Sequence, residues 1–333
     1  MRLPRRRKDA KEEAFLSASP RLRVINESEV SNVTTYTTPL TSEQVQLLRE
    51  ALVAQQFDFE TKPYTIFTAR KGKLNVAVYE KGPKVVIQGK DLADFITFTL
   101  EPQVLGEAKF GYDEVYEPEK FEPHFGIDES GKGDFFGPLV IAGAYVDADI
   151  ARTLKDAGIQ DSKNIGSDKR IRDLAAIIRR TRTPQTVILI GPEKYNQLFA
   201  KFGNLNRLLA WGHARAIENL CELRPDCPRA LSDKFADERL IQRALIDKGK
   251  LLKLEQRTKA ESDYAVAAAS ILAREKFIDW LQKIGDDLGV TIPRGASAQV
   301  KTIARQLIAA RGPEILGTVA KTHFKTAAEV LGP

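Results

Sequence analysis

The sequence contains few of the residues that disulfide-rich or zinc-binding proteins require. Its 333 residues include only two cysteines and three histidines. Cys221 and Cys227 cannot build a disulfide framework, and the chain has no Cys-x-x-Cys pair for a zinc ribbon. No apolar run approaches the roughly 20 residues of a membrane span, and no apolar segment follows the basic start to complete a signal peptide. We therefore expect a cytoplasmic protein with no membrane partner.

What the sequence does contain indicates a globular protein of two domains. A chain of 333 residues is longer than a domain with a single hydrophobic core usually is. Its composition, with 43% hydrophobic and 29% charged residues, is that of a folded protein and not of a disordered one. The net charge is +6. Lys and Arg balance Asp and Glu up to Lys120, and the rest of the chain has 33 basic against 27 acidic residues. A polyanionic partner would therefore be held by the C-terminal two thirds.

We predict that residues 1–30 form a flexible basic arm. Residues 31–111 are predicted to form a small α+β domain. The arm could alternatively contact nucleic acid. In the small domain, a capping box over Thr41–Gln44 predicts a helix up to Gln56. Three β-rich runs with glycine-containing, basic turns predict an antiparallel meander, and apolar residues from Leu92 to Leu100 predict a second helix that leaves one sheet face open. The three runs span residues 64–69, 74–79 and 84–88.

The acidic, proline-bearing stretch 112–123 has the composition of a linker, and residues 124–333 form the second predicted domain. In this domain strand-like and helix-like segments alternate, which predicts an α/β fold with a mixed sheet flanked by helices. The predicted strands are 125–128, 139–146, 186–190, 230–233 and 251–255. The predicted helices are 169–180, 205–223, 238–246 and an alanine-rich helix at 262–288.

The most informative segment places Asp128 and Glu129 at the end of an apolar strand, before a loop with Gly131, Gly133 and Gly137. Carboxylate oxygens suit Mg²⁺ or Mn²⁺, and glycines let a backbone approach closely. In a continuous strand the two acids point to opposite faces. Both can serve one site only if the strand ends there or Glu129 contributes its carbonyl. An exposed acidic turn is an equally good interpretation of this segment alone.

Asp233 ends another apolar run and can bring a third carboxylate to the same sheet edge. Glu261 and Asp263 lie at the start of the alanine-rich helix, where capping alone would explain them. Carboxylates from separate elements are what two-metal phosphodiester hydrolysis requires.

Three other groups are weaker candidates. Lys163, in Asp161-Ser-Lys163, could reach a phosphate or belong to a solvated helix cap. His213 is better explained as a satisfied helix residue than as a catalyst. Lys321 to Lys325 combines cations with an aromatic residue, which fits a nucleic-acid strand or the start of a surface helix.

The segment Gly126 to Pro138, Gly-Ile-Asp-Glu-Ser-Gly-Lys-Gly-Asp-Phe-Phe-Gly-Pro, resembles the signature of ribonuclease HIII, the type 2 ribonuclease H with Gly-Lys-Gly where ribonuclease HII has Gly-Arg-Gly. Further blocks resemble the same family in order along the chain, so the likeness extends from Phe125 to the C-terminus. These blocks are residues 161–163, 203–220, Asp233 and 267–274.

The resemblance implies a ribonuclease H-like catalytic domain, preceded by a small domain similar to the TATA-box-binding protein fold. It also implies an endonuclease that cleaves the RNA strand of RNA–DNA hybrids with Mg²⁺ or Mn²⁺, leaving 5′-phosphate and 3′-hydroxyl ends. No organic cofactor is expected, and a monomer is the default expectation.

By the same resemblance, Asp128, Glu129 and Asp233 are the catalytic, metal-binding carboxylates. We assign the fourth catalytic acid to Asp263, with Glu261 as its rival. The substrate-binding residues are Gly131, Lys132 and Gly133, expected against the ribose 2′-hydroxyls, and Lys163 on the phosphate backbone.

Three other functions are weighed against this one. Cleavage at single ribonucleotides in DNA, as by ribonuclease HII, is disfavoured by Lys132 in place of arginine and by the additional domain. A non-catalytic hybrid-binding protein is disfavoured because the three carboxylates are present. A transposase or resolvase of related fold is disfavoured because the specific blocks match elsewhere.

Overall fold

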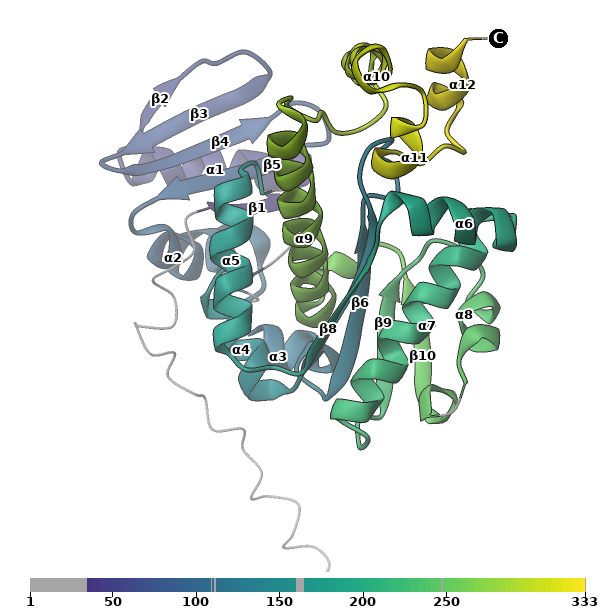
Figure 1. Cartoon of the computed structure of the whole chain (residues 1–333). Coiled ribbons are helices and arrows are strands. Elements are labelled where there is room, and N and C mark those ends of the chain that lie inside the picture. Colours follow the sequence, from purple (N-terminus) through teal and green to yellow (C-terminus); the bar gives the residue numbers. More distant parts are fainter. Residues whose placement is uncertain (1–34, 109, 111, 160–164, 247, 333) are drawn as a thin grey trace, which may run out of the picture.

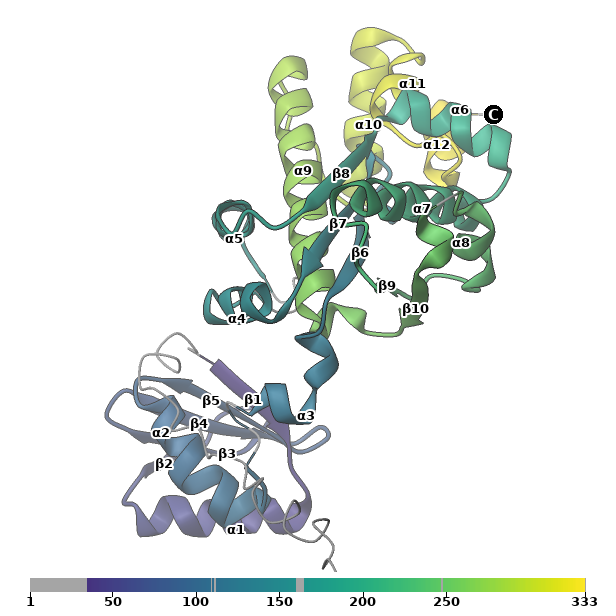
Figure 2. The same cartoon turned by 90° about the horizontal axis from the view of Figure 1, so that it is seen from below.

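The computed structural model describes residues 35–108, 110, 112–159, 165–246 and 248–332. It contains two five-stranded sheets, ordered β1-β5-β4-β3-β2 and β10-β9-β6-β7-β8. Figures 1 and 2 show the two sheets in separate parts of the molecule, joined through the short helix α3. The predicted arm, residues 1–30, and Lys163 lie outside the described residues. No helix in the described part of the chain is long and apolar enough to cross a bilayer.

The small sheet is antiparallel throughout and is covered by helix α1, Ser42–Ala54. The predicted capping box starts this helix, since the Gln44 N–H donates to Thr41 Oγ1 at 3.2 Å and the Thr41 N–H donates to Gln44 Oε1 at 2.9 Å. The meander is confirmed. The edge strands β1 and β2 were not predicted, because they are short and lack an apolar alternation. The strands are β1 Thr35–Pro39, β2 Asp58–Glu60, β3 Thr65–Lys71, β4 Leu74–Tyr79 and β5 Lys84–Gly89.

The predicted second helix is not one regular α-helix. It consists of α2, Leu92–Phe95, followed by a π-helix, Ile96–Leu105, that contains Pro102. Proline has no N–H to donate, so an α-helical bond pattern could not continue through it. The four apolar residues that predicted this helix, Leu92, Phe95, Ile96 and Leu100, are all buried in the core of the small unit. Figure 2 shows α1 and α2 on the same side of this sheet.

The large sheet is mixed, as predicted. Strands β6, β7 and β8 are antiparallel neighbours, whereas β9 runs parallel to both β6 and β10. One face is packed against α4, α5 and α9 and the other against α7 and α8, each with its own buried apolar cluster. The strands are β6 His124–Ser130, β7 Leu139–Val146, β8 Gln185–Ile190, β9 Arg229–Asp233 and β10 Lys253–Arg257.

The central helix α9, Tyr264–Leu288, lies directly on β6. A Cβ atom at Gly126 of β6 would lie 2.1 Å from the Ala265 backbone, so this close packing requires a glycine on the strand and small residues on the helix. The remaining helices are α4 Ala148–Asp156, α5 Asp168–Arg180, α6 Pro192–Phe202, α7 Leu205–Leu223, α8 Arg239–Ala244, α10 Ala298–Arg311, α11 Ile315–Val319 and α12 Lys325–Leu331. Short 3-10 turns are η5 Lys248–Leu251 and η6 Ala260–Ser262.

The stretch predicted as a linker contains two short helices, α3 Asp113–Tyr116 and η3 Pro118–Lys120. It is attached to the large unit by ion pairs. Arg152 of α4 binds Glu114 at 2.6 Å, and Lys155 binds Asp113 at 2.8 Å. The two pairs are half-exposed, so each contributes little to stability alone. Together they attach α3 to α4.

Candidate active site

Two carboxylates lie at the same level on neighbouring parallel strands, Asp128 near the end of β6 and Asp233 at the end of β9. Strands β6 and β9 pair with Ile127 opposite Ser232, so Asp128 and Asp233 follow side by side. Parallel strands deliver their carboxyl ends to one edge, where sites in α/β sheets commonly lie. The sequence-based expectation that Asp233 reaches the edge at Asp128 is confirmed.

Asp128 lies in an environment that disfavours its negative charge. Its Oδ1 accepts the Glu129 N–H at 2.8 Å, and its side chain is hydrogen-bonded to Ser270 of α9. Burial, followed by the charges of Glu129 and Asp233, raises its pKa from 3.8 to about 7 despite those hydrogen bonds. Closely spaced carboxylates that repel one another are stabilised by a bound divalent cation.

Glu129 lies on the other face of the sheet. Strand β6 continues to Ser130, so it does not end between the two acids, and Glu129 points towards α7. His213 Nε2 lies 3.0 Å from Glu129 Oε2, and Lys132 Nζ lies 3.3 Å from Oε1. The pKa of Glu129 is lowered overall, although burial alone would raise it. The hydrogen bond and charge of His213, together with Lys132, outweigh the effect of burial and keep the carboxylate ionised.

The sequence interpretation missed His213 as a site residue. Its ring is fully buried on α7, and Nδ1 lies 3.0 Å from Ser232 Oγ while Nε2 contacts Glu129. The ring therefore connects the glutamate of β6 to the residue just before Asp233 on β9. The position of His213 on a helix was visible in the sequence, but its partner 84 residues away was not.

The glycines of the following loop have different roles. Gly131 has φ +86°, and a Cβ there would lie 2.2 Å from the Pro138 carbonyl, so the fold itself requires glycine. Gly133 faces open space, with no atom within 4 Å of a built Cβ. Between them, Lys132 is partly exposed and its Nζ lies 5.6 Å from the centre of the Phe235 ring. The loop thus presents a cation and an uncovered backbone beside Glu129.

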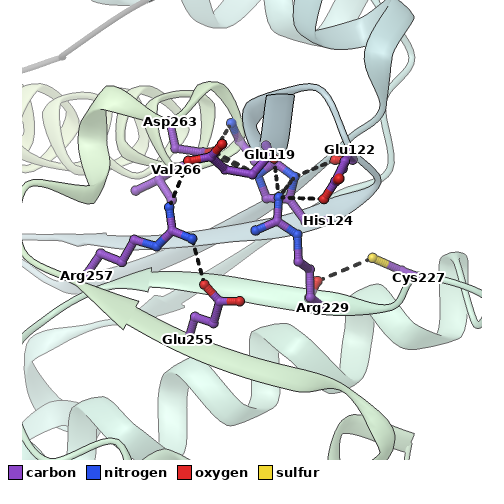
Figure 3. Close-up of polar contacts among 10 residues, drawn as sticks. Glu119, Glu122, His124, Cys227, Arg229, Glu255, Arg257, Asp263 and Val266 are labelled. Carbon is purple, nitrogen blue, oxygen red and sulfur yellow. Dashed lines mark hydrogen bonds and ion pairs between the residues drawn. The ribbon is translucent and has the colours of Figure 1, made fainter. Parts of the chain in front are cut away.

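Asp263 is at the other end of β6 (Figure 3). It caps α9, with Oδ1 accepting the N–H groups of Ala265 at 2.9 Å and Val266 at 3.2 Å, and both oxygens lie 2.9 Å from His124 Nε2. His124 precedes Asp128 by four residues, about 13 Å along a strand. The position of Asp263 therefore does not support its prediction as the fourth catalytic acid. It matches the capping alternative instead.

The rest of this network is also structural. His124 Nδ1 donates to the Glu122 carbonyl at 2.7 Å, and Arg229 donates to the Glu119 carbonyl. Glu261 lies in a different place. It is buried in η6, and the N–H of its neighbour Ala260 donates to Asp233 Oδ1 at 3.3 Å. Of the two candidates for the fourth acid, Glu261 is therefore the one whose neighbour in the chain, Ala260, contacts Asp233 directly.

A helix does start in the segment Lys321 to Lys325, since α12 begins at Lys325, but Lys321 itself is not on the surface. Lys321 is fully buried, and its Nζ donates to the carbonyls of Asp134 and Gly137. It is therefore unavailable to a nucleic-acid strand. His323 is exposed and stacks on Phe199, with ring centres 4.1 Å apart.

The residues that could hold a divalent cation are Asp128, Glu129 and Asp233. In the described part of the chain, no three acidic, histidine or cysteine side chains converge closely enough to hold an ion as they are placed. The fit rests on donor chemistry: these oxygen ligands suit a hard cation, and the raised pKa of Asp128 indicates negative charge that a cation would offset.

Comparison with known proteins gives independent evidence on the family of this chain. The sequence profile described as Ribonuclease HII matches residues 125–327. A protein named Ribonuclease HIII from Protochlamydia amoebophila is 42% identical over 303 residues, which cover 91% of this chain and 99% of the relative. The chain belongs to the ribonuclease HIII family. It is thus a ribonuclease H, and the predicted family and enzyme class are confirmed.

Solved structures from the family have the same fold. The crystal structure of Bst-RNase HIII in complex with Mn²⁺ matches with a TM-score of 0.62 and 26% identity, covering 90% of this chain and 98% of that one. The Aquifex aeolicus RNase H3 structure matches with a TM-score of 0.51 and 27% identity, covering 86% and 99%. The predicted fold class, a mixed sheet flanked by helices after a smaller domain, is confirmed.

Proposed function

We propose that this chain hydrolyses the RNA strand of RNA–DNA hybrids endonucleolytically, leaving 5′-phosphate and 3′-hydroxyl ends. Family membership supports the reaction class. The observation that carries the proposal to particular residues is the adjacent placement of Asp128 and Asp233 on two parallel strands, with Glu129 next to Asp128 on the opposite face of β6. These three acids are the catalytic residues of the proposal.

The cofactor of the proposed reaction is Mg²⁺ or Mn²⁺, held by Asp128, Glu129 and Asp233, as the Mn²⁺ complex of Bst-RNase HIII suggests. When bound, such cations lower the pKa of water and stabilise negative charge on phosphate oxygens. The chain's own residues prepare the site. His213 and Lys132 hold the Glu129 carboxylate in its ionised form, and Ser270 orients Asp128 from α9.

We assign the role of fourth acid to Glu261. It is buried beside Ala260, which contacts Asp233, whereas Asp263 is committed to His124 and the start of α9. Glu261 is thus positioned to add a further carboxylate from a separate element.

Substrate recognition is assigned to Gly131, Lys132 and Gly133, with Lys163 on the phosphate backbone. The open space at Gly133 supports this role, because the fold gives no reason for excluding a side chain there. The ribose 2′-hydroxyl is the group that distinguishes RNA from DNA. Lys132, partly exposed beside Glu129, can neutralise a phosphate close to the acids.

The small unit, residues 31–111, is assigned a substrate-binding role, with residues 112–123 as its connection to the catalytic part, residues 124–333. Its helices cover one face of the sheet only. The other face carries exposed polar side chains of both charges: Arg70, Asn75, Lys84 and Gln88 on β3, β4 and β5, and Asp58 and Glu60 on β2. Arg70 and Lys84 are the side chains of this face that suit contact with a phosphate backbone. We assign the monomer as the active species, and no organic cofactor.

A labelled-strand cleavage assay tests the proposal on three duplexes: an RNA–DNA hybrid, DNA with one ribonucleotide, and DNA alone, each with Mg²⁺, Mn²⁺ or chelator. We expect metal-dependent cuts at several positions of the hybrid's RNA strand. Efficient cleavage at the single ribonucleotide would instead indicate activity of the ribonuclease HII kind. Binding without cleavage would indicate a non-catalytic hybrid-binding protein.

A further inference from the structure

Lys321 is a buried lysine that lies against the glycine loop, defined here as residues 131–137. It comes from the segment between α11 and α12, and none of its surface is exposed. Its Nζ donates to the Gly137 carbonyl at 2.7 Å and to the Asp134 carbonyl at 2.9 Å. The Tyr195 ring centre lies 5.6 Å from the same nitrogen. Burial lowers the pKa of this amine to about 7, against the opposing charge of Asp134.

The backbone around Lys321 pairs with the same loop. The Lys321 N–H donates to the Phe135 carbonyl at 2.8 Å, and the Gly137 N–H donates to the Val319 carbonyl at 2.9 Å. Between these bonds, Phe136 and Ala320 form an isolated antiparallel bridge. The second half of the loop is therefore fixed by residues more than 180 positions later in the chain.

These bonds continue to the exposed part of the loop. The Asp134 N–H donates to the Gly131 carbonyl at 3.3 Å, which closes the turn that carries Lys132 and Gly133. The carbonyl of the same Asp134 accepts from Lys321. The lysine thus holds the carbonyl of the residue whose N–H closes the turn, without contacting the turn's exposed atoms itself.

We propose that Lys321 is a positioning residue for ribose recognition: it fixes the glycine loop so that Lys132 and Gly133 meet the RNA strand in one defined arrangement. This inference rests on the proposed function of the loop. Loss of the ammonium would leave two buried carbonyls without a donor, and a buried unsatisfied acceptor favours a shifted backbone. The shift would weaken contacts that depend on the loop, whereas contacts to DNA made elsewhere would stay the same.

The experiment compares binding of a labelled RNA–DNA hybrid with binding of a DNA duplex of the same sequence, by fluorescence anisotropy in chelator. The variants are Lys321→Met, which keeps the length of the side chain without its donors, and Asn196→Ala. Asn196 holds the same segment, since its Nδ2 donates to the Ala320 carbonyl at 3.0 Å and its Oδ1 accepts the Thr322 N–H at 3.0 Å.

Thr183→Val is the matched control. Thr183 is also a buried donor to a backbone carbonyl, that of Tyr145, but it lies at the opposite end of the sheet from the acids. Melting temperatures are measured for all variants. A role in stability alone lowers the melting temperature and leaves the ratio of hybrid to DNA affinity unchanged.

For Lys321→Met we expect the preference for hybrid over DNA to fall about tenfold, the effect of losing a charge-assisted hydrogen bond. The KM for the hybrid should rise with little change in kcat per folded enzyme. Thr183→Val should keep the wild-type preference. If Lys321→Met does not fold, Asn196→Ala decides by the same criteria, with a smaller loss.

An unchanged preference in the folded variants would overturn the proposal, as would a wild-type protein that binds hybrid and DNA equally. A wild-type protein that cleaves no hybrid would refute the proposed function instead. That result is visible before any Lys321 variant is made.

Discussion

His213 and Glu129 form a buried hydrogen bond of 3.0 Å between Nε2 and Oε2, which joins helix α7 to strand β6 beneath the candidate active site. The other ring nitrogen contacts Ser232, next to Asp233. One fully buried side chain therefore connects both strands that carry the acids. This relationship fixes the direction of the Glu129 carboxylate on the face of the sheet opposite Asp128.

Replacing His213 should reduce catalysis more than substrate binding. In His213→Leu the Glu129 carboxylate loses its hydrogen-bond partner, and we expect kcat to fall about 10- to 100-fold while KM for the hybrid changes little. Steady-state kinetics with thermal unfolding measure both effects. Trp211→Phe, on the same helix, is the control and should keep nearly full kcat. Equal kcat for the two variants would contradict the role of His213.

Substitutions of Glu261 and Asp263, the two candidates for the fourth acid, should have different effects on activity and stability. Glu261→Gln should lose most hybrid cleavage and keep a near-wild-type melting temperature. Asp263→Asn should keep cleavage and lose about 1 kcal/mol of stability, since it weakens a helix cap and the contact with His124. The reverse pattern, with activity abolished by Asp263→Asn alone, would restore Asp263 as the fourth acid.

The two loop glycines give a second matched pair. Gly131→Ala should destabilise the fold, because φ is +86° and the new Cβ would collide with the Pro138 carbonyl. Gly133→Ala should leave the melting temperature unchanged and raise KM for the hybrid. Thermal unfolding and kinetics on both variants test this. Normal KM in Gly133→Ala would remove Gly133 from the substrate-binding set.

Asp128 should make the metal-free protein less stable as the pH rises. Its pKa is about 7 when folded and 3.8 in its ordinary state, so between about pH 4 and pH 7 the folded chain binds a proton that the unfolded chain does not. The free energy of unfolding therefore falls with increasing pH across this window. Asn cannot ionise, so Asp128→Asn should melt at a progressively higher temperature than wild type from pH 5 to pH 8 in chelator. A pH-independent difference would contradict the raised pKa.

Much of this architecture could be predicted from the sequence, because its periodicities are strong. The helix Leu205–Leu223 and the strand Leu139–Val146 have the predicted bounds. Helices α4, α6 and α10 were not predicted. The acids Asp128 and Asp233 could be paired because parallel strands end at a common edge.

The remainder of the site depends on contacts between residues far apart in sequence. Local patterns could not show that His213 meets Glu129, that Lys321 is buried against the glycine loop, or that Asp263 faces His124 at the opposite end of β6. The position of Asp263 in the sequence favoured it as the fourth catalytic acid, whereas its position in the structure does not. Asp263 lies two positions from Glu261 along the chain, yet it contacts His124 at the start of β6, whereas Ala260, the neighbour of Glu261, contacts Asp233 at the end of β9.

The most direct test of the central claim is hybrid cleavage by Asp128→Asn and Asp233→Asn, measured with Mg²⁺ and with Mn²⁺ alongside hybrid binding in chelator. The account predicts that each variant loses cleavage by several orders of magnitude and still binds the hybrid with near-wild-type affinity. Substantial cleavage by either folded variant would contradict the assignment of these two carboxylates to the chemistry.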